Sequence, residues 1–225
     1  MKQDSTRNGR KTVRFGGVET PEGFLFELTG GHLCLDLVNT LDERRNDVPR
    51  ELLNSFVDLV AWGLQAGAVD ESAAQALRRT AQARPRAAAL ALHRARLLRE
   101  ALYAIFSAAA GLRVLPAQAV DQLNTALVPA LAARRLELIA GRPGWVFVEQ
   151  NPPNLDRVLW PAILSAAELL TSADLFRVRE CAGERCAWLF LDRSKNQSRR
   201  WCDMTVCGNR AKARRHFSRV RDRRE

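Results

Sequence analysis

Four cysteines near the end of the chain form two pairs with matched spacing, Cys181-x4-Cys186 and Cys202-x4-Cys207, and fifteen residues separate the pairs. Zinc in structural sites is held by four thiolates in a tetrahedron, whereas catalytic zinc keeps one position open. Four cysteines fill every position, so the pattern predicts one structural Zn²⁺ that does no chemistry. The alternatives are buried thiols or two disulfides, but the pairing, in a chain that we expect to be cytosolic, favours metal.

The excess of basic residues lies in the same segment. Lys and Arg number 35 against 25 Asp and Glu, which gives a net charge of +10. Residues 181–225 contain 13 basic and 5 acidic residues, whereas the first 180 positions carry a net charge of only +2. A polyanionic partner is therefore expected to bind the C-terminal segment. The candidate nucleic-acid-binding residues are Arg199, Arg200, Arg210, Lys212, Arg214, Arg215, Arg219 and Arg223.

A helix after Cys207 would sort these residues by face. We call the loops that carry Cys181, Cys186, Cys202 and Cys207 the metal knuckle. An apolar stripe suited to packing on it would consist of Val206, Ala213, Phe217 and Val220. A row of cations on the opposite face would consist of Lys212, Arg215, Arg219 and Arg223. Such a row suits a phosphate backbone or the major groove, and a solvated helix end would explain only two or three of these charges.

The nature of the partner follows from what accompanies the basic residues. Double-stranded DNA is favoured over RNA because no aromatic platform for stacking bases is visible. An RNA-binding module and a protein–protein adaptor that docks an acidic partner are the alternatives. Two residues before the basic helix are expected to shape the fold first. Asn209 would satisfy free N–H groups at the helix start, and Gly208 would let the chain pass close to the thiolates.

Three polar residues far upstream are candidates for a small-molecule pocket. His32, Asp36 and Asn39 are spaced four and three apart, so on a helix they would share one face. The alternative, which we favour, is capping and buried hydrogen bonding around a helix start. Cys34 lies among leucines and is expected to be a buried thiol. No nucleophile motif or phosphate-binding glycine loop is present, so we expect no enzyme, and a deep pocket around the three polar residues would favour one.

The elements that must position these residues are mostly helical. Hydrophobic residues make up 47% of the chain and charged residues 27%, enough apolar surface for a core. Helical periodicity, with Gly and Pro as breaks, predicts helices at 54–64, 70–83 and 86–110, and from 116 onward with a disturbance at Pro129. Residues 155–170, with a cap at Asn154 and a kink at Pro161, are expected to form one helix or two. Short strands are expected at 24–28 and 188–191, and a hairpin at 136–139 and 145–148 around the turn 141–144.

The predicted fold class is mainly α with a β-hairpin (α+β). We expect a flexible basic arm at 1–17, a mostly helical domain at 18–175, and a four-cysteine zinc finger at 176–225 with a treble-clef-like strand–turn–helix order. The finger is expected to pack on the helices, because a small segment cannot build a core alone. No membrane-spanning run or secretory signal is apparent, so a cytoplasmic protein, associated with the nucleoid when it binds DNA, is expected.

Specific motifs in the finger resemble a known family. The stretch Cys207-Gly208-Asn209-Arg210 is the signature of the CGNR zinc fingers, and Trp188-Leu189-Phe190 and Ser198-Arg199-Arg200-Trp201 match its surroundings. Upstream, Gly31-x4-Asp36-Leu37-Val38-Asn39-Thr40 resembles the opening motif of the ABATE domain, which accompanies this finger. The resemblance covers nearly all of the chain beyond the arm. It implies a stress-induced transcription regulator that binds DNA, with a first domain for ligand sensing or dimerisation.

Overall fold

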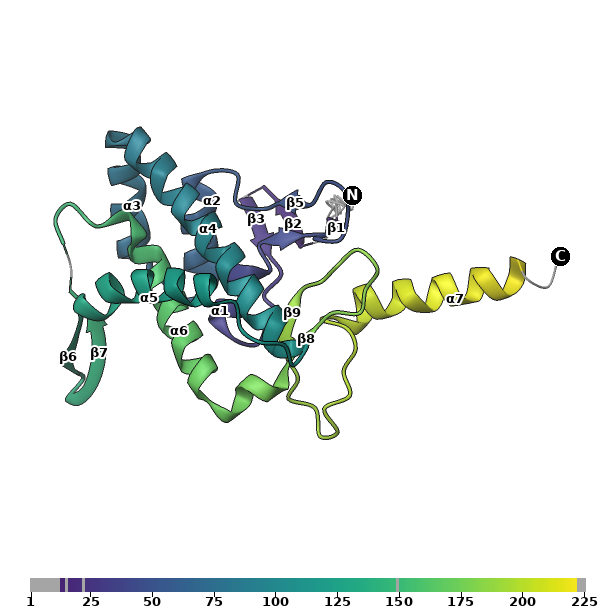
Figure 1. Ribbon diagram of the computed structural model, residues 1–225. Helices are drawn as coiled ribbons and strands as arrows, with labels where there is room; N and C mark the ends of the chain where they lie inside the picture. Colours follow the sequence, from purple (N-terminus) through teal and green to yellow (C-terminus); the bar gives the residue numbers. More distant parts are fainter. Residues whose placement is uncertain (1–12, 15, 22, 149, 222–225) are drawn as a thin grey trace, which may run out of the picture.

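The computed structural model describes residues 13–14, 16–21, 23–148 and 150–221 (Figure 1). A long central helix, α4 (Pro85–Ala110), organises the molecule, and its neighbours contact it along its length. These neighbours include α1 (Leu33–Val38), α2 (Phe56–Gln65), α3 (Glu71–Ala83) and α5 (Ala117–Ala132). The last helix of this bundle, α6 (Trp160–Thr171), packs between α1 and α5. The predicted mainly helical first domain is confirmed.

The core lies where the apolar faces of these helices meet. Leu102, Ile105 and Phe106 of α4 are fully buried, as are Leu35 of α1 and Trp62 of α2. Apolar residues three and four apart on each helix place one face toward this core, which explains why the helical periodicity located these elements well.

The helix starts follow local capping chemistry. Ser55 and Asp58 form a capping box at the start of α2, and Asp70 accepts a hydrogen bond from the backbone N–H of Ala73 at 2.8 Å at the start of α3. Asn154 accepts from the N–H of Asp156 at 2.9 Å, which confirms the predicted cap, but the element that it opens is the short 3₁₀ helix η1 (Leu155–Leu159).

Two proline predictions are wrong in detail. Pro161 was expected to kink the segment 155–170, whether one helix or two, and the structure has two elements there, η1 and α6. Because α6 begins at Trp160, Pro161 occupies the first turn rather than a kink, where its missing N–H would have no helical partner. Pro129 lies inside α5, which nevertheless continues to Ala132. Pro129 removes only the hydrogen bond to the carbonyl of residue 125, one turn back, and α5 continues for three residues beyond it.

The strands form small antiparallel sheets. One sheet contains β1 (Val13–Arg14), β2 (Gly17–Thr20) and β3 (Gly23–Phe26), and the pair β4 (Leu41–Asp42) and β5 (Arg50–Glu51) forms another. Within the range 1–17, where a flexible arm was expected, strand pairing begins at Val13; residues 1–12 lie outside the described part of the chain. The strand expected at 24–28 is β3, which starts one residue earlier and ends at Phe26.

The predicted hairpin consists of β6 (Arg134–Ile139) and β7 (Arg142–Phe147). Its turn is tighter than the expected four-residue turn, since only Ala140 and Gly141 lie between the strands. Both have positive φ, 50° and 78°, as a two-residue hairpin turn that matches the strand twist requires. Ile139 pairs with Arg142 directly after this turn, so Gly144 lies inside β7.

The last elements form the finger and are joined to the main core. The strands β8 (Val178–Glu180) and β9 (Leu189–Leu191) pair antiparallel, followed by a π-helical turn at Met204–Gly208 and by α7 (Asn209–Arg221). Val178, Leu189 and Leu191 are buried in the same core as the bundle helices, so the first half of the finger packs on the bundle. By contrast, α7, yellow in Figure 1, extends away from the rest of the molecule. No helix among the described residues is long and apolar enough to cross a membrane.

Candidate metal centre and nucleic-acid interface

The four cysteines come from both halves of the finger. Cys181 directly follows β8, and Cys186 lies in the loop that leads to β9. Cys202 precedes the π-helical turn and Cys207 lies within it, just before α7. The hairpin thus supplies one pair and the start of the helix the other. This strand–turn–helix order agrees with the predicted finger.

The positions of the sulfur atoms fit a tetrahedral metal. The four Sγ atoms lie within 4.8 Å of one another, with 3.7 Å between those of Cys186 and Cys202 and 3.8 Å between those of Cys202 and Cys207. Four thiolates about 2.3 Å from one zinc ion lie about 3.8 Å apart, whereas disulfide sulfurs lie about 2.0 Å apart. All four side chains are buried, so the site is closed to substrate.

Backbone N–H groups and a glycine complete this metal centre. The N–H of Gly183 donates to Cys181 Sγ at 3.4 Å, and that of Trp188 donates to Cys186 Sγ at 3.5 Å. A Cβ atom at Gly183 would lie only 3.0–3.4 Å from Cys186 Cβ and the sulfurs of Cys207 and Cys181. Gly183 therefore lets the chain pass close to the thiolates, which is the role that the sequence assigned to Gly208. A Cβ atom at Gly208 would instead meet Met204.

The start of α7 also differs from the expectation for Asn209. The side chain of Asn209 donates to the carbonyl of Thr205 at 2.9 Å. The free N–H groups are satisfied by Asp203, whose Oδ1 accepts from the backbone N–H groups of Thr205 and Val206, the latter at 3.0 Å. Asp203 thus caps the π-helical turn that carries Cys207.

Asn39 connects the first domain to the finger. Its Nδ2 donates to the carbonyl of Leu189 at 2.9 Å, and its Oδ1 accepts from the N–H of the same residue at 2.9 Å. Asn39 is 2% exposed, so both bonds are shielded from water. This side chain therefore pairs with β9 as a neighbouring strand would.

Residues 41–45 form the second part of this connection, which sequence reasoning missed. Arg45 Nη1 donates to the carbonyls of Cys181 at 3.1 Å and Gly183 at 2.8 Å, and its guanidinium pairs with Glu180. The indole Nε1 of Trp188 donates to the carbonyl of Leu41 at 3.2 Å. The only signal in the sequence was that these residues directly follow the upstream motif, and a motif does not reveal a contact across 136 positions.

The three candidate pocket residues bond to three different parts of the chain. His32 Nδ1 lies 2.6 Å from Ser165 Oγ of α6, and Asp36 Oδ1 accepts from the N–H of Gly30 at 2.8 Å. Asn39 bonds to β9. These bonds support the alternative of structural hydrogen bonding and give no support to a pocket there. Cys34 is fully buried, and burial raises the pKa of its thiol to about 12, which confirms the expectation of a buried thiol.

We predict that Asn39→Ala lowers the free energy of unfolding by about 3 kcal/mol, because it leaves a buried N–H and a buried carbonyl of β9 without partners. Urea unfolding of the zinc-loaded protein measures this change. Asn124→Ala, an exposed position on α5, is the matched control and should change stability by less than about 0.5 kcal/mol. Equal effects of the two substitutions would contradict the connecting role of Asn39.

Asp36 should make stability depend on pH. Burial raises the pKa of its carboxyl to about 6, although the N–H of Gly30 opposes the shift. The folded state therefore holds a proton that the unfolded chain releases near pH 4, so stability falls as the pH rises from about 4 to about 6. Asp36→Asn keeps an oxygen acceptor for Gly30 and should remove this fall, about 3 kcal/mol. Unfolding curves of both proteins across that range measure the difference, in which any shared effect of zinc cancels. Parallel curves would contradict the assignment.

The residues before α7 contribute unequally to a basic surface. Arg199 Nη2 donates to the carbonyl of Cys202 at 2.6 Å, and its guanidinium lies 4.5 Å from the ring centre of Phe190. This side chain is thus engaged in the finger itself. Arg200 is exposed, with its guanidinium 5.4 Å from the ring centre of Trp201. Arg200 is therefore the better placed of the two for a phosphate.

Arg210 faces inward. It is half-buried and lines a small cavity behind the metal knuckle together with Glu27 and Asp42. Burial, Asp203 and Asp42 raise the pKa of Glu27 to about 7, and the charge of Arg210 opposes this rise. The positive charge of Arg210 thus stabilises acidic groups of its own chain. Its position therefore gives less support to DNA contact than the sequence pattern suggested.

The remaining candidates belong to α7. Lys212 and Arg215 are exposed, and Arg214 is exposed but pairs with Glu184. Arg219 lies in α7, although the structure does not describe its side chain, and Arg223 lies outside the described residues.

Only the beginning of the expected apolar stripe, among the described residues, lies against the metal knuckle: Val206 is half-buried and lines the small cavity behind it, whereas the part of the stripe on α7 does not pack there. Ala213 is exposed and Phe217 is 71% exposed, and both line an open cleft of about 350 Å³ beside the knuckle. The expectation fails because α7 is joined to the metal centre at its start, by the π-helical turn that carries Cys207, and the helix then extends away from the body (Figure 1). Val220 lies in α7, but its side chain is not described.

Two family models match the chain. Residues 31–173 match ABATE, described as "Putative stress-induced transcription regulator", and residues 177–220 match the CGNR zinc finger. Neither is an enzyme family. No curated protein matches the sequence. Together with the four-cysteine cluster, the zinc-finger match establishes one structural zinc ion, held by Cys181, Cys186, Cys202 and Cys207.

Proposed function

This chain belongs to the ABATE family and carries a CGNR zinc finger, and on that premise we propose that it is a transcription regulator that binds double-stranded DNA through the finger and α7. The contacts would come from the exposed cations of α7, with Arg200 added from the preceding loop. Zinc has no catalytic part in this function, because its four thiolate ligands leave no open position.

The observation that carries this proposal is the composition and exposure of α7. Its thirteen residues, NRAKARRHFSRVR, include six Lys or Arg and no Asp or Glu. Every residue from Lys212 to Ser218 is exposed, so these cations are available to a partner. Like charges one turn apart repel each other, and phosphates would relieve that repulsion.

The shape of α7 also suits duplex DNA. Thirteen residues at about 1.5 Å each give a helix about 20 Å long, and the major groove, about 12 Å wide, admits an α-helix. Because α7 extends away from the body in Figure 1, the bundle does not cover its exposed face. Lys212 and Arg215 share this face at a spacing of three residues, which suits two neighbouring phosphates.

The first domain would fix the orientation of the finger and serve in ligand sensing or dimerisation. Asn39 and Arg45 bond to β9 and to the metal knuckle, so the two parts move together. One finger with one basic helix has a small footprint on DNA, which favours a homodimer on two half-sites. A regulator of this kind would work in the cytoplasm, at the nucleoid.

Selection from random duplex DNA tests the proposal. Zinc-loaded protein is incubated with the library at physiological salt, and the retained DNA is sequenced, with structured RNA as competitor in a parallel reaction. An enriched motif supports sequence-specific binding, and a two-fold repeat of it supports a dimer. Preferential retention of RNA, or no retention of either nucleic acid, would overturn the proposal in favour of an RNA-binding module or a protein–protein adaptor, respectively.

A further inference from the structure

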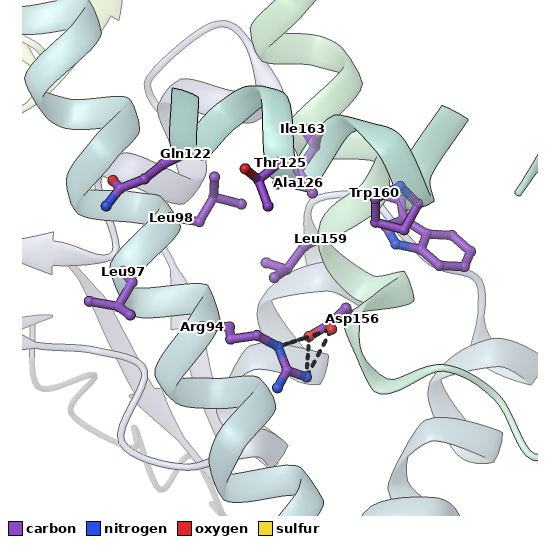
Figure 2. A pocket seen from close by; sticks show the side chains of 11 residues that line it. Arg94, Leu97, Leu98, Gln122, Thr125, Ala126, Asp156, Leu159, Trp160 and Ile163 are labelled. Atoms are coloured by element: carbon purple, nitrogen blue, oxygen red, sulfur yellow. Dashed lines mark hydrogen bonds and ion pairs between the residues drawn. The ribbon is translucent and has the colours of Figure 1, made fainter. Parts of the chain in front are cut away.

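A cavity of about 360 Å³ lies in the first domain, between α4, α5, η1 and the start of α6 (Figure 2). Its volume falls within the range of small-molecule sites, which are mostly apolar with a few placed polar groups. The apolar walls are formed by Leu97, Leu98, Ala126, Pro129, Leu159 and Ile163. The cavity is separate from the metal centre, because none of these residues belongs to the finger.

The charged residues at the rim neutralise each other. Arg94 Nε and Nη2 donate to the carboxylate of Asp156 at 2.9–3.2 Å, as the dashed lines of Figure 2 show. Thr125 also has its hydroxyl proton engaged, since it donates to the carbonyl of Asp121 at 2.9 Å. A charged ligand would therefore find no opposite charge to spare, and the cavity favours a neutral molecule.

Trp160 adds a polar group without a partner. Its side chain is 1% exposed, and its indole Nε1 has no hydrogen-bond partner among the described residues. Figure 2 shows the nitrogen edge of this indole on the side of the cavity. Phe147 holds the ring from β7, with 5.5 Å between the ring centres. Buried N–H groups normally have partners, so this N–H is a donor that an acceptor on a ligand would satisfy.

We propose that this cavity binds a small, neutral, mostly apolar molecule that carries one hydrogen-bond acceptor, and that Trp160 Nε1 donates to this acceptor. Carbonyl compounds such as ketones and esters have this chemistry. The assignment deepens the ligand-sensing role proposed above and rests on that role for its purpose.

The location of the cavity suits a sensor. Leu97 and Leu98 belong to α4, and the same helix carries Glu100 and Ser107, which contact Arg44 at 2.7 Å and Glu180 at 2.7 Å. Glu180 ends β8, immediately before the first metal ligand. A ligand that contacts α4 would thus contact the helix that supports the finger.

Calorimetric titration of the zinc-loaded full chain with butyrophenone tests the site. Pentylbenzene, a hydrocarbon with the same number of heavy atoms, is the matched ligand without an acceptor. We expect the ketone to bind about five- to tenfold more tightly, the effect of one hydrogen bond. Trp160→Phe keeps a ring against Phe147 and should make the two affinities equal. An unchanged preference in this variant, or no binding of either compound to the wild type, would overturn the proposal.

A filled cavity provides the second test. Ala126→Phe places a ring among the lining residues and should reduce binding of both compounds at least tenfold. Val128→Phe makes a similar change at a 68% exposed position of the same helix and should leave both affinities unchanged. Equal affinities of these two variants would show that the compounds bind elsewhere. Because no DNA is present, the result is independent of whether α7 binds DNA.

Discussion

Cys202→Ser should remove zinc from the protein and unfold the finger, with a loss of about 5 kcal/mol or more in the free energy of unfolding. Structural zinc contributes more than this to the folding of isolated fingers, because the metal replaces a core that such small segments lack. Serine cannot supply the thiolate that completes the tetrahedron, and three buried thiols would remain at distances set by the metal.

The loss should reach beyond the finger. Leu189 and Leu191 lie between the two cysteine pairs along the chain and are buried in the core shared with the bundle. Disorder of the metal knuckle would also release Arg45 and Asn39 from their bonds. Deletion of residues 181–225 would therefore leave a bundle with an exposed apolar face, so point substitutions are the sharper experiment.

Metal content by mass spectrometry and urea unfolding measure this effect together. The wild type should contain one zinc ion per chain, and Cys202→Ser should contain none. Cys34→Ser is the matched control, because Cys34 is fully buried but lies outside the cluster. It should keep its zinc and lose only about 1–2 kcal/mol, since a hydroxyl replaces a buried thiol. A Cys202→Ser protein with wild-type zinc content would contradict the assignment of the ligands.

Features that depend on neighbouring residues could be predicted from the sequence. The spacing of the cysteines is a local property, and the structure brings all four together. The cap at Asn154 is local too, because it depends on residues two apart. The two-residue turn at Ala140 and Gly141 was missed, since the glycine at 144 made a longer turn equally compatible with the sequence.

Features that depend on distant contacts could not be predicted in this way. Nothing near Asn39 in the sequence indicates that it pairs with Leu189, 150 positions later. For Phe217 the sequence predicted a contact that does not form. A stripe of apolar residues predicts a buried face only when another element is present to cover it, and Phe217 is exposed. The cavity of the first domain likewise forms only in the folded chain. Folding brings Arg94 to Asp156 and places beside this pair the indole Nε1 of Trp160, which has no hydrogen-bond partner in the described part of the chain.

Neutralising two cations of α7, with Lys212→Ala and Arg215→Ala together, should weaken DNA binding about 10- to 100-fold at physiological salt. The slope of log K against log salt concentration is negative, and each phosphate contact that is lost reduces its magnitude by about 0.9, so the magnitude should fall by about 1.8. The helix itself should persist, because alanine is the best helix former and the change reduces repulsion between like charges. Fluorescence anisotropy with a labelled duplex across a salt series measures both quantities.

Two further variants separate direct contact from the effect of net charge. Arg79→Ala with Arg86→Ala removes the same charge from exposed positions of α3 and α4, and it should leave the salt slope unchanged. Arg214→Ala should have a smaller effect per residue than the α7 pair, because Glu184 already neutralises part of that charge. If the bundle variant lost as much affinity as the α7 variant, the basic helix would contribute only to a long-range field, and the binding surface would lie elsewhere.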